Sequence, residues 1–219
     1  RSAIYASLNW QHGDAKAFLA AKDWHSIEVT AGVTVFDAKQ HNFNFPAPLD
    51  MTNISLNYDD KFLDAVNNGF LPETFVQNCR QAMQTGEPGF SFNFGDKENE
   101  TLRNACTEVT SEDDSDVCNL GSINIGAIDD IEEFRSIVRV ASMFLVAGTL
   151  VADLPTKKVY EVRAKNRRLG LGLMGIHEFL LKRGSSYEVT EELHRWLEVY
   201  RDESEKAANM LCDERGINH

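Results

Sequence analysis

The segment 104–108 reads Asn-Ala-Cys-Thr-Glu and sets an amide, a thiol and a carboxylate at alternate positions. In an extended chain, alternate side chains share a face and lie about 6.6 to 6.8 Å apart, so these groups would line one side of a substrate the size of a sugar ring. Glu108 can then take a proton from a hydroxyl, Asn104 can orient a neighbouring hydroxyl, and the sulfur of Cys106 can act on the carbon between them. Positions i and i+2 of a helix do not face each other, so this chemistry requires a strand or a taut loop.

The chemical role of Cys106 depends on its neighbours. A nearby carboxylate disfavours the thiolate, which makes the residue a poor nucleophile and favours a one-electron role for the sulfur. The competing interpretation is an ordinary Asx turn with a buried cysteine. Cys118 follows a polar loop, 111–116, whose reversal would bring the second thiol within disulfide distance of the first. The alternative for Cys118 is a structural thiol that precedes a turn at 119–121.

The composition narrows the class of protein. A chain of 219 residues with 42% hydrophobic content can bury a core. Its net charge of −12 and the lack of a basic cluster longer than 166–168 argue against a nucleic-acid partner. Four cysteines are too few for a disulfide scaffold and favour a reducing compartment. The longest apolar run, 138–154, is interrupted by polar residues and is expected to be a buried helix rather than a membrane span.

The hydrophobic pattern predicts alternating strands and helices in one domain, which indicates an α/β architecture. Asp14 is expected to cap a short helix that carries Phe18, Leu19 and Trp24. Between the first and second halves lies a loop-rich region, 86–130. The other expected elements are strands over 27–36 and 52–56 and helices over 59–66, 72–85, 131–154, 174–182 and 190–215.

Other motifs have simpler explanations than chemistry. Residues 170–175 match the glycine fingerprint of dinucleotide-binding proteins, but the basic segment before them is no apolar strand, so we expect glycines that let a helix start pack closely. A nicotinamide-dependent dehydrogenase stays as an alternative that rests on this match alone. No metal site is expected, because the histidines lack a second ligand at helical spacing and the acidic run 112–116 is typical of a solvated loop.

The two remaining cysteines are expected to be core residues. Cys79 shares one helix face with Phe75 and Met83, at positions i, i+4 and i+8. Cys212, near the end of the last helix, receives the same interpretation.

The pattern Asn104-x-Cys106-x-Glu108, followed by Cys-Asn-Leu-Gly-Ser-Ile-Asn at 118–124, resembles the active-site loop of the large, catalytic chain of ribonucleotide reductases. The resemblance covers essentially the whole chain, and its central motifs are highly specific. Flanking segments resemble the same family in the same order: 1–22, 51–55, 86–89 and 166–175.

This resemblance implies a ten-stranded α/β barrel with a central finger loop that carries Cys106. Residues 1–219 would form part of that catalytic barrel. The chain starts with Arg1 and stops at His219 after an unfinished turn, so we expect an internal fragment whose flanking portions are absent and which is inactive by itself.

The resemblance also implies roles for single residues. Cys106 would be the thiyl radical that abstracts the ribose 3′-hydrogen, Glu108 the base for the 3′-hydroxyl, and Asn104 the partner of the substrate hydroxyls. Ala105 and Thr107 would complete the substrate-binding set. Cys118 would be one half of the redox pair that reduces the 2′ position and ends as a disulfide, with its partner cysteine upstream of this chain.

The stretch between Cys106 and Cys118 is most similar to the adenosylcobalamin-dependent class, in which the cofactor supplies the radical. The alternatives are a class I large chain, whose radical comes from a separate metal-containing subunit, and a non-catalytic piece of the same family. The implied partners are a ribonucleotide, a thiol reductant of the thioredoxin type, a nucleotide effector and a second copy in a homodimer. The implied location is the cytoplasm, with no nucleic acid or membrane, and the di- or triphosphate form of the substrate stays open.

Overall fold

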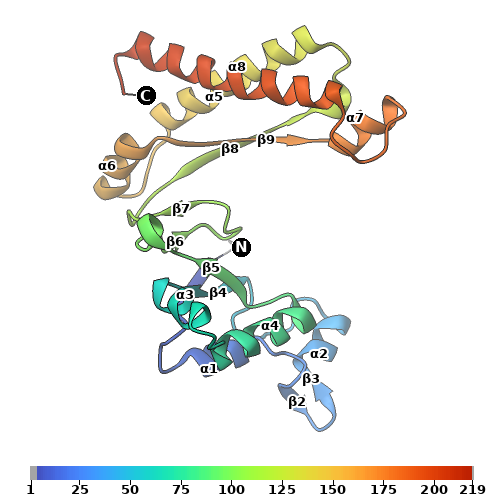
Figure 1. Ribbon diagram of the computed structural model, residues 1–219, viewed down its shortest axis with the longest axis vertical. Helices are drawn as coiled ribbons and strands as arrows, with labels where there is room; N and C mark the ends of the chain where they lie inside the picture. The colour runs from blue at the N-terminus through green and yellow to red at the C-terminus, as the bar shows by residue number, and fades with distance from the viewer. Residues whose placement is uncertain (1–3, 219) are drawn as a thin grey trace. The chain divides into compact units, whose positions relative to one another are not determined.

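The computed structural model describes residues 4–218, so the motif at 1–3 and the expectation at His219 lie outside the described residues. The chain divides into two compact units, Arg1–Asp114 and Ser115–His219 (Figure 1). Each unit has its own parallel strand pairing and its own apolar core. Each of the two units is described by itself.

A three-stranded parallel sheet forms the centre of the first unit. Its order is β1 (Ile4–Asn9), β4 (Thr52–Tyr58) and β5 (Gly89–Phe92), with Asn53 opposite Tyr5 of β1. The middle strand β4 extends two residues beyond the predicted 52–56, and its side chains Ile54, Leu56 and Tyr58 are completely buried. This burial explains why the strand was readable from its β-branched and apolar residues, whereas the half-exposed β1 was not predicted.

Three helices accompany this sheet: α1 (Ala15–Ala20) and α3 (Asp60–Asn67) contact its strands, and α4 (Glu73–Thr85) packs on α1 and, through Phe75, on Tyr58 of β4. The expected helices 59–66 and 72–85 are confirmed. Asp59 caps α3 by accepting from the Phe62 amide, and Gly86 ends α4 in the left-handed conformation. Asp14 stands at the start of α1, but its side chain makes no capping hydrogen bond, so its predicted role was wrong.

The segment between α1 and β4 differs from the prediction. The expected strand 27–36 is a short hairpin, β2 (Glu28–Thr30) and β3 (Val33–Thr34), followed at once by α2 (Val35–His41). The strand ends because Thr34 and Asp37 form a capping box, in which each side chain accepts a bond from the other's backbone amide. The backbone and hydroxyl donors of Thr34 hold the pKa of Asp37 below its ordinary value.

The region 86–130 contains more regular structure than the loop that was expected. It holds β5, the short 3₁₀ helices η1 (Gly95–Lys97) and η2 (Ile125–Ala127), the small hairpin of β6 (Leu102–Arg103) and β7 (Thr110–Ser111), and β8 (Cys118–Asn124). β8 was missed because its polar residues and central glycine weaken the strand signal.

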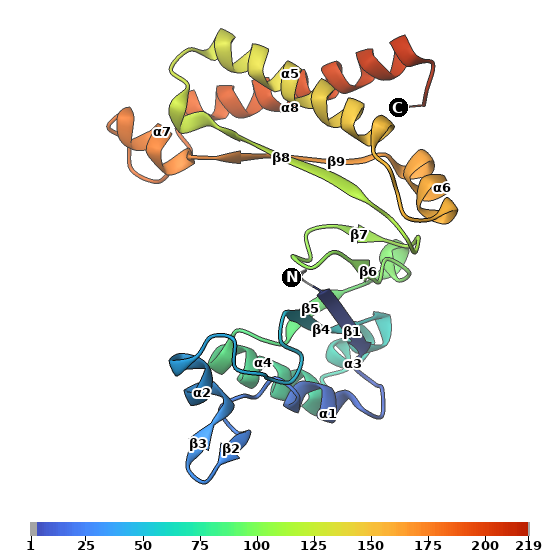
Figure 2. The same cartoon turned by 180° about the vertical axis from the view of Figure 1, so that it is seen from behind.

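The second unit places two long helices over a pair of parallel strands (Figure 2). The strands β8 and β9 (Arg168–Met174) pair over seven positions, and α5 (Ile131–Val151) packs on both of them and on α8 (Glu191–Arg215). Phe134, Phe179 and Trp196 form the centre of its core. The predicted α5, α7 (Ile176–Lys182) and α8 are confirmed within a few residues, and α6 (Lys157–Asn166) was missed.

The glycines at 170–175 serve a strand rather than a helix start. Gly170 and Gly172 lie inside β9, and a Cβ on Gly170 would fall 2.4 Å from a methyl carbon of Leu120 on β8. Gly175 starts α7 with φ +77°, so it alone fits the expected role. The dinucleotide fingerprint needs its glycines after the strand, at the turn into the helix, and this structure therefore argues against that alternative.

Helix α5 is long and apolar enough to cross a membrane by length and composition, contrary to the sequence-based expectation. Its packing shows a core helix instead. Phe134, Val138 and Leu145 are buried, and Arg139 on the same helix forms an ion pair with Glu203 of α8, 2.7 Å between nitrogen and oxygen. The expectation of a buried helix is confirmed for this inner side, while the side chain of Phe144 is 75% exposed.

Candidate functional site

The segment 104–108 is a tight turn that joins β6 to β7. The Thr107 amide donates to the Asn104 carbonyl at 3.0 Å, and Thr107 adopts a left-handed φ of +69°. The side-chain oxygen of Asn104 accepts from the Val109 amide at 3.2 Å. Of the two expected conformations, a strand or a taut loop, the segment therefore adopts the taut loop. The prediction of an extended strand with alternating side chains is wrong.

The turn determines what each predicted residue can offer. Cys106 and Glu108 are exposed, and Asn104 is half-buried. Because the side-chain carbonyl of Asn104 accepts from Val109, the NH₂ group is the part of this side chain that can donate a hydrogen bond to a ligand. The competing interpretation is wrong in both parts: the side chain of Asn104 accepts from an amide five residues on rather than two, as an Asx turn requires, and Cys106 is exposed.

Hydrogen bonds hold the small hairpin on the first unit's sheet. At its base, Arg103 donates to Ser91 Oγ at 2.6 Å, and Ser91 donates in turn to the buried Asn93 at 2.8 Å. On the opposite strand, the Thr110 hydroxyl donates to Glu100 Oε2 at 2.7 Å. These contacts fix the position of both strands that carry the turn.

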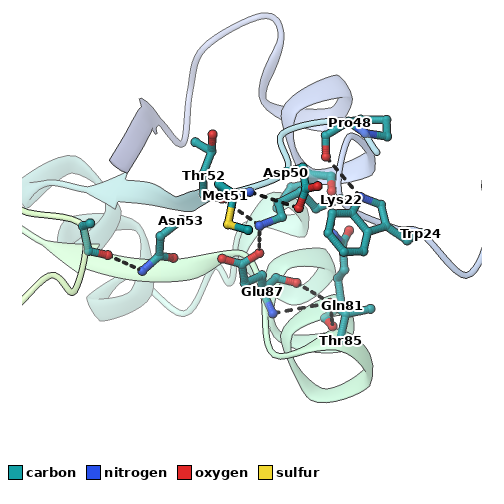
Figure 3. Close-up of polar contacts among 12 residues, drawn as sticks. Lys22, Trp24, Pro48, Asp50, Met51, Thr52, Asn53, Gln81, Thr85 and Glu87 are labelled. Carbon is teal, nitrogen blue, oxygen red and sulfur yellow. Dashed lines mark hydrogen bonds and ion pairs between the residues drawn. The ribbon is translucent and has the colours of Figure 1, made fainter. Parts of the chain in front are cut away.

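Asn53 of β4 reaches the turn itself. Its Nδ2 donates to the carbonyl oxygen of Ala105 at 2.8 Å (Figure 3). Sequence reasoning missed this residue. The available signal was an amide side chain at the second position of a strand whose polar and apolar residues alternate from Asn53 onward.

Cys118 belongs to the second unit and is the first residue of β8, opposite Arg168 of β9. Its thiol is half-buried. Residues 119–121 continue the strand, so the turn expected there is wrong. The side chain of Asn119 donates to Thr149 Oγ1 of α5 at 2.9 Å and ties the start of β8 to that helix.

The acidic run beside Cys118 is only partly a solvated loop. The carboxylate of Asp116 is 4% exposed, and it accepts from Arg168 Nε at 2.6 Å and from Asn166 Nδ2 at 2.8 Å. Asn166 and Arg168 of the predicted basic cluster therefore fix Asp116, two residues before the start of β8. Within residues 4–218, no group of three histidine, cysteine or acidic side chains is arranged to hold a metal ion.

The other cysteines are only partly the core residues that were expected. Cys212 is buried beside Val146 of α5, as expected. Cys79 is half-buried, and Met83, predicted on the same inner face, is 88% exposed. All four cysteines are free thiols.

Comparison with known proteins shows the family to which the chain belongs. The model of the ribonucleotide reductase barrel domain matches residues 80–219, which include the turn, both of its flanking strands and the whole second unit. The chain belongs to the ribonucleotide reductase barrel-domain family. The predicted fold class, part of the family's α/β barrel, is thereby confirmed.

Individual ribonucleotide reductases are similar over most of the chain. A vitamin B12-dependent ribonucleoside-diphosphate reductase of Thermoplasma acidophilum is 28% identical, with 99% of this chain and 30% of the relative covered. A vitamin B12-dependent ribonucleoside-diphosphate reductase of Mycobacterium tuberculosis is 27% identical, with 78% and 29% covered. A ribonucleoside-diphosphate reductase subunit alpha of Chlamydia trachomatis is 33% identical over 52% of the chain and 12% of its own length.

A solved structure shows the same fold. The class Id ribonucleotide reductase alpha subunit of Actinobacillus ureae superposes with a TM-score of 0.69 at 19% identity, over 95% of this chain and 41% of that one. The chain spans about 30% of the length of the vitamin B12-dependent relatives named above.

Proposed function

We propose that this chain is part of the catalytic barrel of a ribonucleotide reductase, which reduces ribonucleotides to deoxyribonucleotides. The observation that supports this proposal best is the turn at 104–108, which presents an exposed thiol between an amide and a carboxylate in a chain of this family. A thiol at the tip of a pinned turn can meet a substrate without a rearrangement of the core.

In the proposed reaction, the Cys106 sulfur, as a thiyl radical, takes the 3′-hydrogen of the ribose and becomes a thiol. Glu108 accepts the proton of the 3′-hydroxyl, and the NH₂ group of Asn104 holds the neighbouring hydroxyl. The backbone of Ala105 and Thr107 completes the surface against the sugar.

The 2′-hydroxyl then leaves as water. Cys118 and a second cysteine, which the resemblance assigns to an upstream segment, supply two electrons and two protons and become a disulfide. Glu108 returns its proton to the 3′ oxygen, and Cys106 returns its hydrogen to the 3′ carbon and is again a radical. The net change is one ribonucleotide and two thiols converted to one deoxyribonucleotide, one water and one disulfide, which an external thiol of the thioredoxin type reduces.

We propose adenosylcobalamin as the radical source, because two of the relatives carry vitamin B12 dependence in their names. When bound, that cofactor supplies a carbon radical able to take a hydrogen atom. The exposed position of Cys106 suits a radical source that approaches from outside the turn. A separate radical-generating subunit is the second candidate, favoured by the similarity to the alpha subunits from Chlamydia trachomatis and Actinobacillus ureae.

The remaining parts of the proposal concern the complete protein. We expect a ribonucleotide substrate, a nucleotide effector, a homodimer and a cytoplasmic location, and we expect neither nucleic acid nor a membrane as a partner. The whole-chain charge of −12 supports the expectation that nucleic acid is not a partner.

Cysteine substitutions in the full-length protein test the proposal. Cys106→Ser should abolish deoxynucleotide formation with adenosylcobalamin and a dithiol present and no second subunit added. Cys79→Ser, a half-buried thiol of α4, is the matched control and should leave turnover near the wild-type rate. Substantial turnover by the Cys106 variant would reject the proposed role, and activity only after a metal-containing subunit is added would select the second candidate.

A further inference from the structure

The hydrogen bond from Asn53 to the Ala105 carbonyl connects the turn to strand β4, outside the hairpin. Two of the turn's hydrogen bonds, Thr107 to Asn104 and Val109 to Asn104, join residues within 104–109, so they define its shape but not its direction. The bonds of Arg103 and Thr110 act at the base of the hairpin. The Asn53 amide acts beside the tip, on the carbonyl of the peptide that leads into Cys106.

The donor itself stands on a rigid support. Asn53 lies in the central strand β4, paired with β1 at this position. The preceding carbonyl, of Thr52, accepts from Lys22 Nζ at 2.7 Å (Figure 3). The side chain of Lys22 is only 9% exposed and also pairs with the carboxylate of Glu87, which follows α4. The start of β4 is therefore held by its pairing with β1 and by Lys22, which Glu87 holds in turn. Asn53 stands on this fixed strand and connects it to the turn.

We propose that Asn53 is a positioning residue, which fixes the peptide between Ala105 and Cys106 and thereby the direction in which the Cys106 sulfur faces. This inference rests on the proposed function for its effect on turnover, because hydrogen transfer needs the reacting atoms within a few tenths of an ångström of their best position. Asn53 need not touch the substrate for this role. Its loss lets the turn pivot about the base of the hairpin.

The strand offers a matched control. Asn57 lies four residues further along β4, so its side chain leaves the same face of the strand, and its Nδ2 donates to Ser7 Oγ of β1 at 3.1 Å instead of to the turn. Asn53→Asp and Asn57→Asp both keep the side-chain shape and remove the amide donor. They differ in whether that donor serves the turn.

Hydrogen exchange in the full-length protein tests the positioning role without any need for activity. The amides of Thr107 and Val109 should exchange about five-fold faster in the Asn53→Asp protein, the factor expected when one ordinary hydrogen bond is lost. They should keep the wild-type rate in the Asn57→Asp protein. Asn53→Ala is a second variant should the aspartate prevent folding. Unchanged exchange in the Asn53 variant, or equal acceleration in both variants, would overturn the inference.

Kinetics with a 3′-deuterated ribonucleotide then separates positioning from general destabilisation. Asn53→Asp should lower kcat on the order of ten-fold, change KM less than two-fold and raise the deuterium isotope effect, because hydrogen abstraction becomes slower than the other steps. An unchanged isotope effect with a normal kcat would also refute the positioning role. A wild-type protein with no reductase activity would instead refute the proposed function, while the exchange result would still decide whether Asn53 pins the turn.

Discussion

Replacement of Asn78 by alanine should be among the most damaging single changes to the first unit. Asn78 is completely buried on α4, where its Oδ1 accepts from the Tyr58 hydroxyl and its Nδ2 donates to the Pro88 carbonyl, both at 2.8 Å. The alanine variant leaves both partners buried without that bond, at about 1 to 3 kcal/mol each, and adds a small cavity. We expect a loss of about 3 to 5 kcal/mol in the free energy of unfolding.

A double-mutant cycle with Tyr58→Phe isolates the bond between the two side chains. Tyr58→Phe alone should cost about 1 to 2 kcal/mol, but little in the Asn78→Ala protein, where the hydroxyl has already lost this partner. Urea denaturation followed by tryptophan fluorescence measures each variant. Gln77→Ala, whose amide bonds Glu73 on the solvent side of α4 at 2.8 Å, is the control and should cost less than about 0.5 kcal/mol. Additive losses from Asn78→Ala and Tyr58→Phe would refute the reasoning.

The same tyrosine predicts a pH dependence. Burial, and to a lesser extent the nearby Cys79, raise the pKa of Tyr58 well above its ordinary value of 10.0. Since only the unfolded tyrosine releases its proton just above pH 10, the stability that Tyr58 contributes is complete below pH 10 and declines as the pH rises further. The Tyr58→Phe protein should lose less stability between pH 9 and pH 11 than the wild type. Equal losses would contradict this assignment.

Two further predictions concern the second unit. Burial raises the pKa of Glu203, but its hydrogen bonds and ion pairs with Arg139 and Arg135 together outweigh that effect and hold the pKa below its ordinary value of 4.5. The stabilisation by Glu203 is therefore present above pH 4.5 and lost as the pH falls below it, so Glu203→Gln should flatten the acid side of a melting-temperature profile, and an unchanged profile would contradict this. Gly175→Ala should cost about 1 to 3 kcal/mol more than Gly184→Ala in urea denaturation, because both glycines have positive φ but a Cβ at 175 would lie 2.0 Å from Asn124 Oδ1. Equal costs would show that this crowding is relieved.

The sequence was most informative where one physical signal dominated. The helices with clear apolar periodicity and caps, such as α3, α4 and α8, were predicted within about two residues. Strand β8 was missed because its contacts with β9 and α5 stabilise a polar, glycine-containing segment that has little strand preference of its own. Local pattern cannot reveal such long-range pairing.

The candidate site shows the same limit. The residue types at 104–108 indicated chemistry, and the family match supports the resemblance on which their roles depend. Of the two conformations that the sequence allowed, only the structure shows which is adopted. The side-chain carbonyl of Asn104 accepts from the Val109 amide, and this bond breaks the alternation that an extended chain would have. Asn53, 52 residues away in sequence, could be found only from the fold.

The β8–β9 pair has a consequence for the handling of the protein. Two parallel strands expose a row of main-chain donors and acceptors along each outer margin, unless another strand covers it. Such margins recruit strands from any neighbouring molecule, and seven-residue parallel ladders assemble slowly because their partners are distant in the chain. Dilute, cool conditions during recovery of the polypeptide from denaturant should therefore favour monomers over fibrous or amorphous precipitate.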